Sequence, residues 1–247
     1  MKLASLKDGS RDGKLVIVSR DLTRCTDASF LTATLQAALD NWHRISPHLS
    51  ALAESLEVGA VPEMRFHEHD AHAPLPRAFQ HVGCGDFFVG PRDGVTVGGA
   101  NIQASAAGAI IVTDVGLGEE IGAGRDAVAL VLLSAVLSNA DGEAIGAGFS
   151  PVAVTPDELG GEWNAGIVWP IQVSVDGKQA DVTTPSVDFG GLIAKASKTR
   201  PLSAGAILVA PGAPVTLQTG DVLRVEMKDR AGHSIFGAIE QTLAAAE

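Results

Sequence analysis

A short polar segment of the chain concentrates side chains that commonly bind metals. His67, Asp70 and His72 lie in the sequence FHEHDAH, residues 66–72. Alternate residues of an extended chain share a face, so imidazole and carboxylate groups at this spacing could hold a metal ion. The same residues also fit a polar connection between two domains that runs over the surface. We favour the connection and keep a metal site at His67, Asp70 and His72 as the alternative hypothesis.

A thiol with a potential base nearby is the second chemical candidate. Cys84 stands between two glycines, with His81 and Asp86 close in the sequence. A cysteine activated by a histidine can act as a nucleophile, but flanking glycines are more typical of a turn in which the thiol is inert. Cys25 is the other cysteine, and the two lack metal-ligand spacing. We therefore expect two free, inert thiols.

Three cations near the end of a predicted helix form the third candidate. Lys195, Lys198 and Arg200 lie in the stretch AKASKTRPL. Cations close to a helix end could bind the carboxylate of a small molecule. Packing at the helix terminus explains the same residues, and the sequence favours that interpretation.

Composition limits the classes of function open to the chain. It has 247 residues, 46% of them hydrophobic, and a formal net charge of -11. This acidity and the lack of a basic run argue against binding nucleic acid. The sequence also has no signal-like segment and no apolar stretch near the length of a membrane span. These features predict a folded cytoplasmic protein with no membrane partner.

The first part of the chain predicts a small α/β unit. Apolar runs on both sides of the GSRDG turn indicate a β-hairpin within residues 3–22. Helical periodicity follows over residues 32–56, with Ser46 and Pro47 between its two apolar sets, which predicts a helix pair or one broken helix. Periodicity is lost over residues 61–76, which are rich in proline and predict a surface connection.

The remainder reads as mostly β structure. Short apolar or alternating runs are separated by glycine, proline and aspartate turns, which is typical of strands. These runs are residues 109–112, 129–133, 168–175, 206–209 and 222–227. We predict a small N-terminal domain over residues 1–62, a linker over residues 63–84 and a C-terminal domain over residues 85–247.

Motifs in a fixed order identify a family that the chain resembles. The stretch FSPVAVTPDEL resembles the fumarylacetoacetate hydrolase family, and so do MKLASLKDGSRDGKLVIVSRDL at the start and five further motifs. Those five are AHAPLPRAF, GPRD, DFGGLIAKASKTRPLSAG, GDVLRVEM and SIFGAIEQ. The resemblance implies a small N-terminal α/β domain followed by a rolled mixed β-sandwich that usually forms a homodimer. Mixed α+β structure, mostly β, is therefore the predicted fold class.

The same resemblance implies a type of chemistry. Enzymes of this family cleave carbon–carbon bonds in β-diketo acids, or carry out related decarboxylation, hydration or isomerisation. A bound Mg²⁺, Mn²⁺ or Ca²⁺ polarises the substrate in such enzymes, and hard cations of this kind need oxygen ligands. By resemblance, the chain would be a hydrolase acting on carbon–carbon bonds in ketonic substances.

The positions that should carry the metal ligands hold no carboxylate. The resemblance places two glutamates at about Ala106 and Gly108 and an aspartate at about Ala135, and it places a lysine at about Ala144. No acidic residue occurs from Gly94 to Thr113. A Mg²⁺ site without carboxylates would lack both charge and ligands, so we expect no bound metal cofactor.

Other parts of the expected site are also reduced. The segment that should carry an aspartate, a general-base histidine and an arginine is shortened to residues 80–89, and a substrate-contacting stretch corresponds to residues 209–214. Tyrosine is absent from the chain. Ser105, Ser134 and Ser138 are the polar residues nominated for the former pocket, on the assumption that the strand registers are kept.

Two functions follow from these observations. In the first, the chain is a non-catalytic or repurposed homologue, a pseudoenzyme that binds a small molecule or a partner through the retained scaffold. In the second, it is an active hydrolase, decarboxylase or isomerase of acylpyruvate-like substrates that uses a relocated metal site or no metal. A small carboxylate-bearing molecule and a second copy of the chain are the predicted partners.

Overall fold

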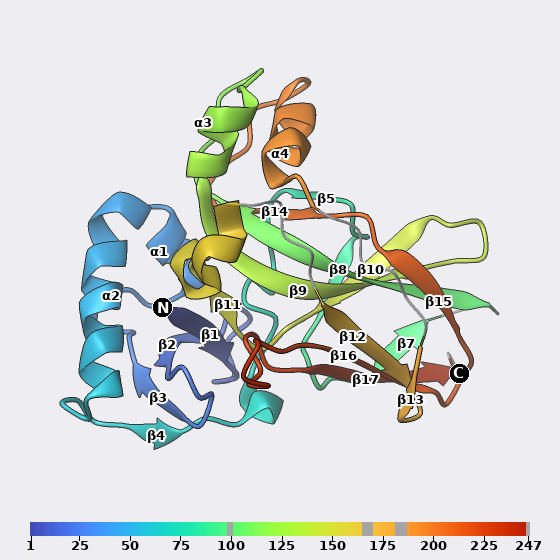
Figure 1. Ribbon diagram of the computed structural model, residues 1–247, viewed down its shortest axis with the longest axis horizontal. Coiled ribbons are helices and arrows are strands. Elements are labelled where there is room, and N and C mark those ends of the chain that lie inside the picture. The colour runs from blue at the N-terminus through green and yellow to red at the C-terminus, as the bar shows by residue number, and fades with distance from the viewer. Residues whose placement is uncertain (98–100, 165–169, 181–186, 246–247) are drawn as a thin grey trace.

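Two β-sheets and several helices, the longest of 16 residues, make up the protein in the computed structural model (Figure 1). The structure describes residues 1–97, 101–164, 170–180 and 187–245. Most elements are strands, and each sheet contains both parallel and antiparallel pairs. Side chains from both sheets contribute to one hydrophobic core. The predicted fold class, mixed α+β with mostly β structure, is confirmed.

The N-terminal strands form an antiparallel ribbon that continues into the large sheet. Their bounds are β1 (Lys2–Leu6), β2 (Lys14–Val18), β3 (Arg24–Asp27) and β4 (Met64–Arg65). The predicted hairpin is confirmed, with Leu3 opposite Ile17. Gly13 closes its turn with φ +68°, and a Cβ there would lie 2.7 Å from the Leu6 carbonyl oxygen. Only glycine therefore fits this position without strain.

The two predicted helices are present, but the break between them is not at the proline. They are α1 (Leu35–Leu39) and α2 (Trp42–Glu57), and Pro47 lies inside α2. The chain leaves helical geometry at Asn41 instead, where φ is -133° and ψ is 35°. Proline removes one backbone donor, but Leu49, Leu52 and Leu56 are buried along α2. Packing of this apolar face maintains the helix past Pro47.

The large sheet is built around two long antiparallel strands, β8 (Ile102–Val112) and β9 (Val128–Ser138). Its main path runs β4-β3-β2-β1-β11-β9-β8-β14-β5, so the N-terminal ribbon joins the central strands through β1 and β11. The remaining strands are β11 (Ala153–Val154), β14 (Ala206–Val209), β5 (His81–Val82), β10 (Ala144–Phe149), β6 (Phe87–Val89) and β15 (Ala213–Leu217).

A second sheet packs against the face of β8 and β9 (Figure 1). It has the order β13-β12-β16-β17-β7. The bounds are β13 (Lys178–Gln179), β12 (Ile171–Val175), β16 (Val222–Met227), β17 (Ile239–Ala245) and β7 (Val95–Val97). Leu223, Val225 and Met227 are buried, and the residues between them are more exposed, as the alternation in the sequence predicts.

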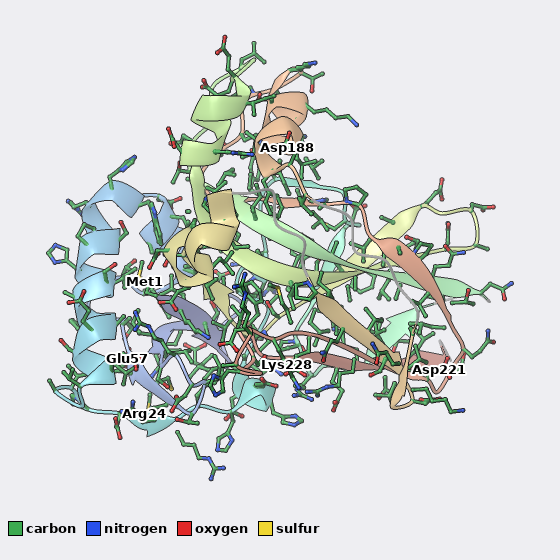
Figure 2. All side chains as sticks on the ribbon, viewed as in Figure 1. Met1, Arg24, Glu57, Asp188, Asp221 and Lys228 are labelled. Atoms are coloured by element: carbon green, nitrogen blue, oxygen red, sulfur yellow. The ribbon has the colours of Figure 1, made fainter. Side chains whose placement is uncertain are left out.

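Two helices stand above one end of the large sheet (Figure 1). They are α3 (Ile121–Asp126) and α4 (Phe189–Ser197). Asp188, labelled in Figure 2, caps α4 by accepting a 3.1 Å hydrogen bond from the Gly191 amide. Short 3₁₀ helices cover Glu68–Asp70 and Pro156–Asn164. No helix among the described residues is long and apolar enough to cross a membrane.

The segment predicted as a surface connection is partly buried. Phe66, Ala71 and Leu75 are at most 5% exposed, and the His72 amide donates to the Ser5 carbonyl at 2.8 Å. The irregular spacing of these apolar residues hides them from a search for periodicity, although Phe66 and Leu75 pack in the core. The division into domains 1–62 and 85–247 with a linker at 63–84 remains a prediction.

Candidate functional site

The candidate site lies where β8 and β9 pair in the centre of the large sheet. Ala106 faces Ala135 in the register, and Gly108 faces Leu133. Residues two apart on a strand share a face, as do directly paired residues. Ala106, Gly108 and Ala135 therefore lie together on one face of the sheet, which is the geometry that the resemblance requires for three metal ligands.

This face is covered from the second sheet. Ala106 is 6% exposed and Ala135 is fully buried. Gly148 of β10 pairs with Ala135, and a Cβ on Gly148 would lie 2.4 Å from Gln241 Oε1. Gln241, from β17, is itself 4% exposed and donates from Nε2 to the Gly90 carbonyl at 2.8 Å. The Gln241 side chain thus packs directly over the strand beside Ala135.

The edge of β8 at these positions is covered by main chain. Ala213 pairs with Ala106, and the Ala210 amide donates to the Gly108 carbonyl at 3.0 Å. A Cβ on Gly212 would lie 2.4 Å from the Ala106 carbonyl oxygen. The stretch 209–214, which the resemblance assigned to substrate contact, therefore packs along the positions of the expected ligands.

The nominated serines lie on the other face of the sheet. Ser105 pairs with Val136 and Ser134 pairs with Ala107, so both alternate with the positions of the expected ligands. Ser134 is fully buried, and its Oγ donates to the Ala107 carbonyl at 3.1 Å. Ser138 shares the face of Ser134 and pairs with Gln103. The registers thus separate the serines from Ala106, Gly108 and Ala135.

The predicted lysine position lies apart from this face. Ala144 is exposed at the start of β10, beside the turn that contains Asp141 and Glu143. Asn139 organises that turn by accepting hydrogen bonds from the amides of Asp141 and Glu143 at 3.0 and 2.9 Å. The two acidic side chains of the turn, Asp141 and Glu143, are exposed.

The residues at these positions do not fit the metal that the fold implies. Mg²⁺, Mn²⁺ and Ca²⁺ are held mainly by carboxylate oxygens. Ala106, Gly108 and Ala135 offer no side-chain oxygen, and the Ala106 and Gly108 carbonyls face Gly212 and Ala210 along the strand edge. We therefore derive no metal-dependent step from this arrangement.

The alternative metal set is not assembled. His67 is exposed and precedes a 3₁₀ helix, while the carbonyl of Asp70 accepts a 2.7 Å bond from the Lys7 amide. His72 lies half-buried, and its ring approaches Gly13. Within the described parts of the chain, no three His, Cys, Asp or Glu side chains are grouped so that they could hold a metal ion.

Sequence reasoning missed an ion-pair network that joins the family-like motifs. Arg92, from GPRD, contacts the Glu68 carboxylate and lies 2.8 Å from Glu240. Glu240 also accepts from Arg224 at 2.8 Å, and this hydrogen bond is the main cause of its lowered pKa. Lys228, labelled in Figure 2, extends the network through Glu226 at 3.8 Å. These residues are far apart in the sequence, so their spacing gives no signal for the network.

Cys84 is buried rather than poised for catalysis. It is 8% exposed, and burial raises the pKa of its thiol to about 12. His81 lies on β5, and its Nε2 is 3.9 Å from the Asp86 carboxylate. Burial likewise raises the pKa of Cys25 to about 11. Because the thiolate is the nucleophilic form, both cysteines are inert, as predicted.

Thiol labelling provides a check on this burial. At about pH 8, a thiol of pKa about 12 is ionised in roughly one molecule in ten thousand. We expect a disulfide reagent such as DTNB to label neither Cys25 nor Cys84 in the native protein and to label both after denaturation. Rapid labelling of one thiol in the folded protein would contradict the burial described here.

Several solved structures share the fold of this chain. Maleylpyruvate hydrolase from Sphingobium sp. SYK-6 has the same fold, with a TM-score of 0.72, 18% identity and coverage of 100% of both chains. The fumarylacetoacetate hydrolase from Exiguobacterium antarcticum gives a TM-score of 0.74 at 16% identity, and a probable 2-hydroxyhepta-2,4-diene-1,7-dioate isomerase from Mycobacterium abscessus gives 0.72 at 15%, again over 100% of both chains. The fold is that of fumarylacetoacetate hydrolases.

The first part of the sequence also matches a family model. Residues 1–77 match the family model described as fumarylacetoacetase N-terminal domain 2. No curated protein sequence matches the chain. The family model and the fold together confirm the resemblance to the fumarylacetoacetate hydrolase family.

Proposed function

We propose that this chain is a cytoplasmic pseudoenzyme of the fumarylacetoacetate hydrolase superfamily that has lost metal-dependent carbon–carbon bond hydrolysis. Its retained scaffold binds a small molecule or a partner instead. The proposal rests on the face of β8 and β9 at Ala106, Gly108 and Ala135. The resemblance assigns three carboxylates to these positions, and the residues there are buried and have no side-chain oxygen.

Packing around this face supports the proposal. Gln241 covers Gly148 on one side, and the main chain at Gly212 covers the Ala106 carbonyl on the other. A substrate chelated to a metal would need this space, since the metal has to be bound by the strands and the substrate by the metal. The solved structures with the same fold are described as hydrolases and an isomerase. The proposal is that this chain has kept their fold and lost that type of activity.

An activity assay tests the proposed loss. The full chain is incubated with acylpyruvates in the presence of Mg²⁺, Mn²⁺ or Ca²⁺, and cleavage is followed as loss of the enol absorbance. We expect the rate to equal the uncatalysed background, because no residue of the face can hold the metal. Metal-dependent turnover at about 1 s⁻¹ or faster, which is the ordinary range of enzymes, would overturn the proposal.

A pair of variants distinguishes our proposal from the alternative, an active enzyme with a relocated metal site. If the assay shows turnover, the double variant His67→Ala and His72→Ala should abolish it under that alternative. His43→Ala, at an exposed histidine of α2, serves as the control. Under our proposal neither variant changes the background rate, since these histidines form no metal group.

A further inference from the structure

The large sheet has a free edge at β4, which begins its strand path and lies along the lower margin of the molecule in Figure 1. Arg65 of β4 faces Arg24 of β3 in the register. The Arg24 amide donates to Ser19 Oγ at 3.0 Å, and its carbonyl accepts from the Ser19 amide at 2.9 Å, on the side of β3 away from β4. Arg24 and Arg65 are therefore a pair without mutual hydrogen bonds, and the Arg65 amide and carbonyl point outward from the sheet.

An apolar cavity adjoins this edge on one face of β4. It measures about 340 Å³, and its walls include Phe30, Leu52, Val61 and Met64. Phe30 is 73% exposed and Met64 is 44% exposed, and exposed apolar side chains that cluster often mark an interaction surface. Cavities of roughly 150 Å³ lined by apolar side chains can bind benzene. The cavity beside Met64 is therefore large enough to take an aromatic or aliphatic side chain.

The opposite face of β4 carries a cation without a carboxylate partner. Arg24, labelled in Figure 2, is paired with Glu63 at 2.7 Å, and Lys14 of β2 is paired with Asp27 at 3.2 Å. Arg65 is exposed, and no ion pair joins it to another residue in the part of the chain that the structure describes. A carboxylate of a binding partner is the group complementary to Arg65.

We propose that β4 binds an extended segment of another protein as an added antiparallel strand, and that this segment carries an acidic residue directly next to a bulky apolar residue. The acidic residue lies opposite Arg65, exchanges two main-chain hydrogen bonds with it and pairs with its guanidinium group. Neighbouring side chains of a strand point to opposite faces, so the apolar residue lies on the face of Met64 and enters the cavity. In strand addition, main-chain hydrogen bonds give affinity and side-chain pockets give specificity.

An extended segment uses all three features of this edge. A small apolar molecule would fill the cavity but would leave the outward main-chain groups of Arg65 and its charge without partners. Proteins usually cover or block a sheet edge, whereas residues 62–65 are exposed along this one. On the sheet path, β3, β2, β1 and β11 separate β4 from β9. The inference therefore does not depend on the proposed loss of hydrolysis.

Fluorescence anisotropy of a fluorescein-labelled peptide, Thr-Val-Glu-Phe-Thr, titrated with the full chain tests the site. We expect a Kd of about 100 µM or lower. The peptide Thr-Glu-Val-Phe-Thr has the same composition, but its glutamate and phenylalanine are two residues apart and share a face, so it should bind about 10-fold more weakly. Methylation of the glutamate nitrogen in the first peptide removes the donor to the Arg65 carbonyl and should also weaken binding about 10-fold.

Charge reversal tests the contact with Arg65. Arg65→Glu should lose the first peptide and gain Thr-Val-Lys-Phe-Thr, which the wild type should not bind. Phe30→Asp should weaken binding of the first peptide about 10-fold or more, because a charge replaces a wall of the cavity. Val58→Asp is the matched control, since Val58 is 79% exposed and does not line this cavity, and it should bind as the wild type does.

Thermal unfolding of each variant checks that its fold is retained, which we expect because all three side chains are exposed. No binding of the first peptide up to about 1 mM would overturn the proposal. Equal binding of the two peptides of the same composition would also overturn it, because the cavity would then take the ring alone. A lower sedimentation coefficient of Phe30→Asp than of the wild type would show that a second copy covers this face, which would likewise contradict the proposal.

Discussion

Replacing Ala135 with aspartate should destabilise the protein by about 3–5 kcal/mol instead of restoring a metal ligand. Ala135 is fully buried and pairs with Gly148, over which the Gln241 side chain packs. A carboxylate there loses its hydration without gaining a cation. The free energy of unfolding from urea titration, with and without Mn²⁺, measures the effect.

The pH dependence of this loss has a definite sign. Burial raises the pKa of a carboxyl group in the folded state above its unfolded value of about 3.9. The unfolded chain then releases its proton first as the pH rises, so the deficit of the variant should be smallest below about pH 4 and should grow toward neutral pH.

Ala144→Asp provides the matched control, because Ala144 is exposed at the start of β10. Its effect should stay within about 0.5 kcal/mol, the usual range for a surface substitution. If Ala135→Asp were as stable as this control, or were strongly stabilised by Mn²⁺, the description of a closed and apolar face would be wrong.

Gly85→Ala should also cost about 3 kcal/mol or more. A Cβ on Gly85 would lie 1.9 Å from the Ile145 carbonyl carbon and 2.2 Å from the Gly146 nitrogen. These are backbone atoms of β10, so the contact can be relieved only by moving a strand. Chemical denaturation of the variant measures the loss of stability.

Gly94→Ala is the control for this substitution. No heavy atom lies within 4 Å of a Cβ built on Gly94, and no left-handed φ restricts it. We expect little change or a slight gain in stability, because alanine reduces the freedom of the unfolded chain. Equal stability of the two variants would show that the segment around Gly85 does not pack against β10 as described.

The sequence predicted the strands and the fold class well where a physical pattern was strong. The alternation of apolar and polar residues over 222–227 predicts the strand found there, and the glycine-containing turn predicts the first hairpin. The resemblance that the motifs carry agrees with the family model that matches residues 1–77 and with the fold. The break in the helical region was misplaced, because the packing of Leu49, Leu52 and Leu56 outweighs the local effect of Pro47.

The candidate site was predictable only in part. Adjacent positions such as Ser105 and Ala106 must point to opposite faces of a strand, so the serines could have been separated by the period of two alone. The coverage by Gln241 and the network around Arg92 could not be predicted, because they join residues far apart in the sequence. The tertiary fold brings these residues together, and their spacing along the sequence does not indicate it.

Manganese binding by the unmodified chain tests the central claim most directly. Free Mn²⁺ gives a strong six-line electron paramagnetic resonance signal that weakens when the ion is bound. With no carboxylate at Ala106, Gly108 and Ala135, we predict that adding the protein leaves the signal of Mn²⁺ unchanged. Binding of one Mn²⁺ per chain with a Kd below about 10 µM would contradict the account.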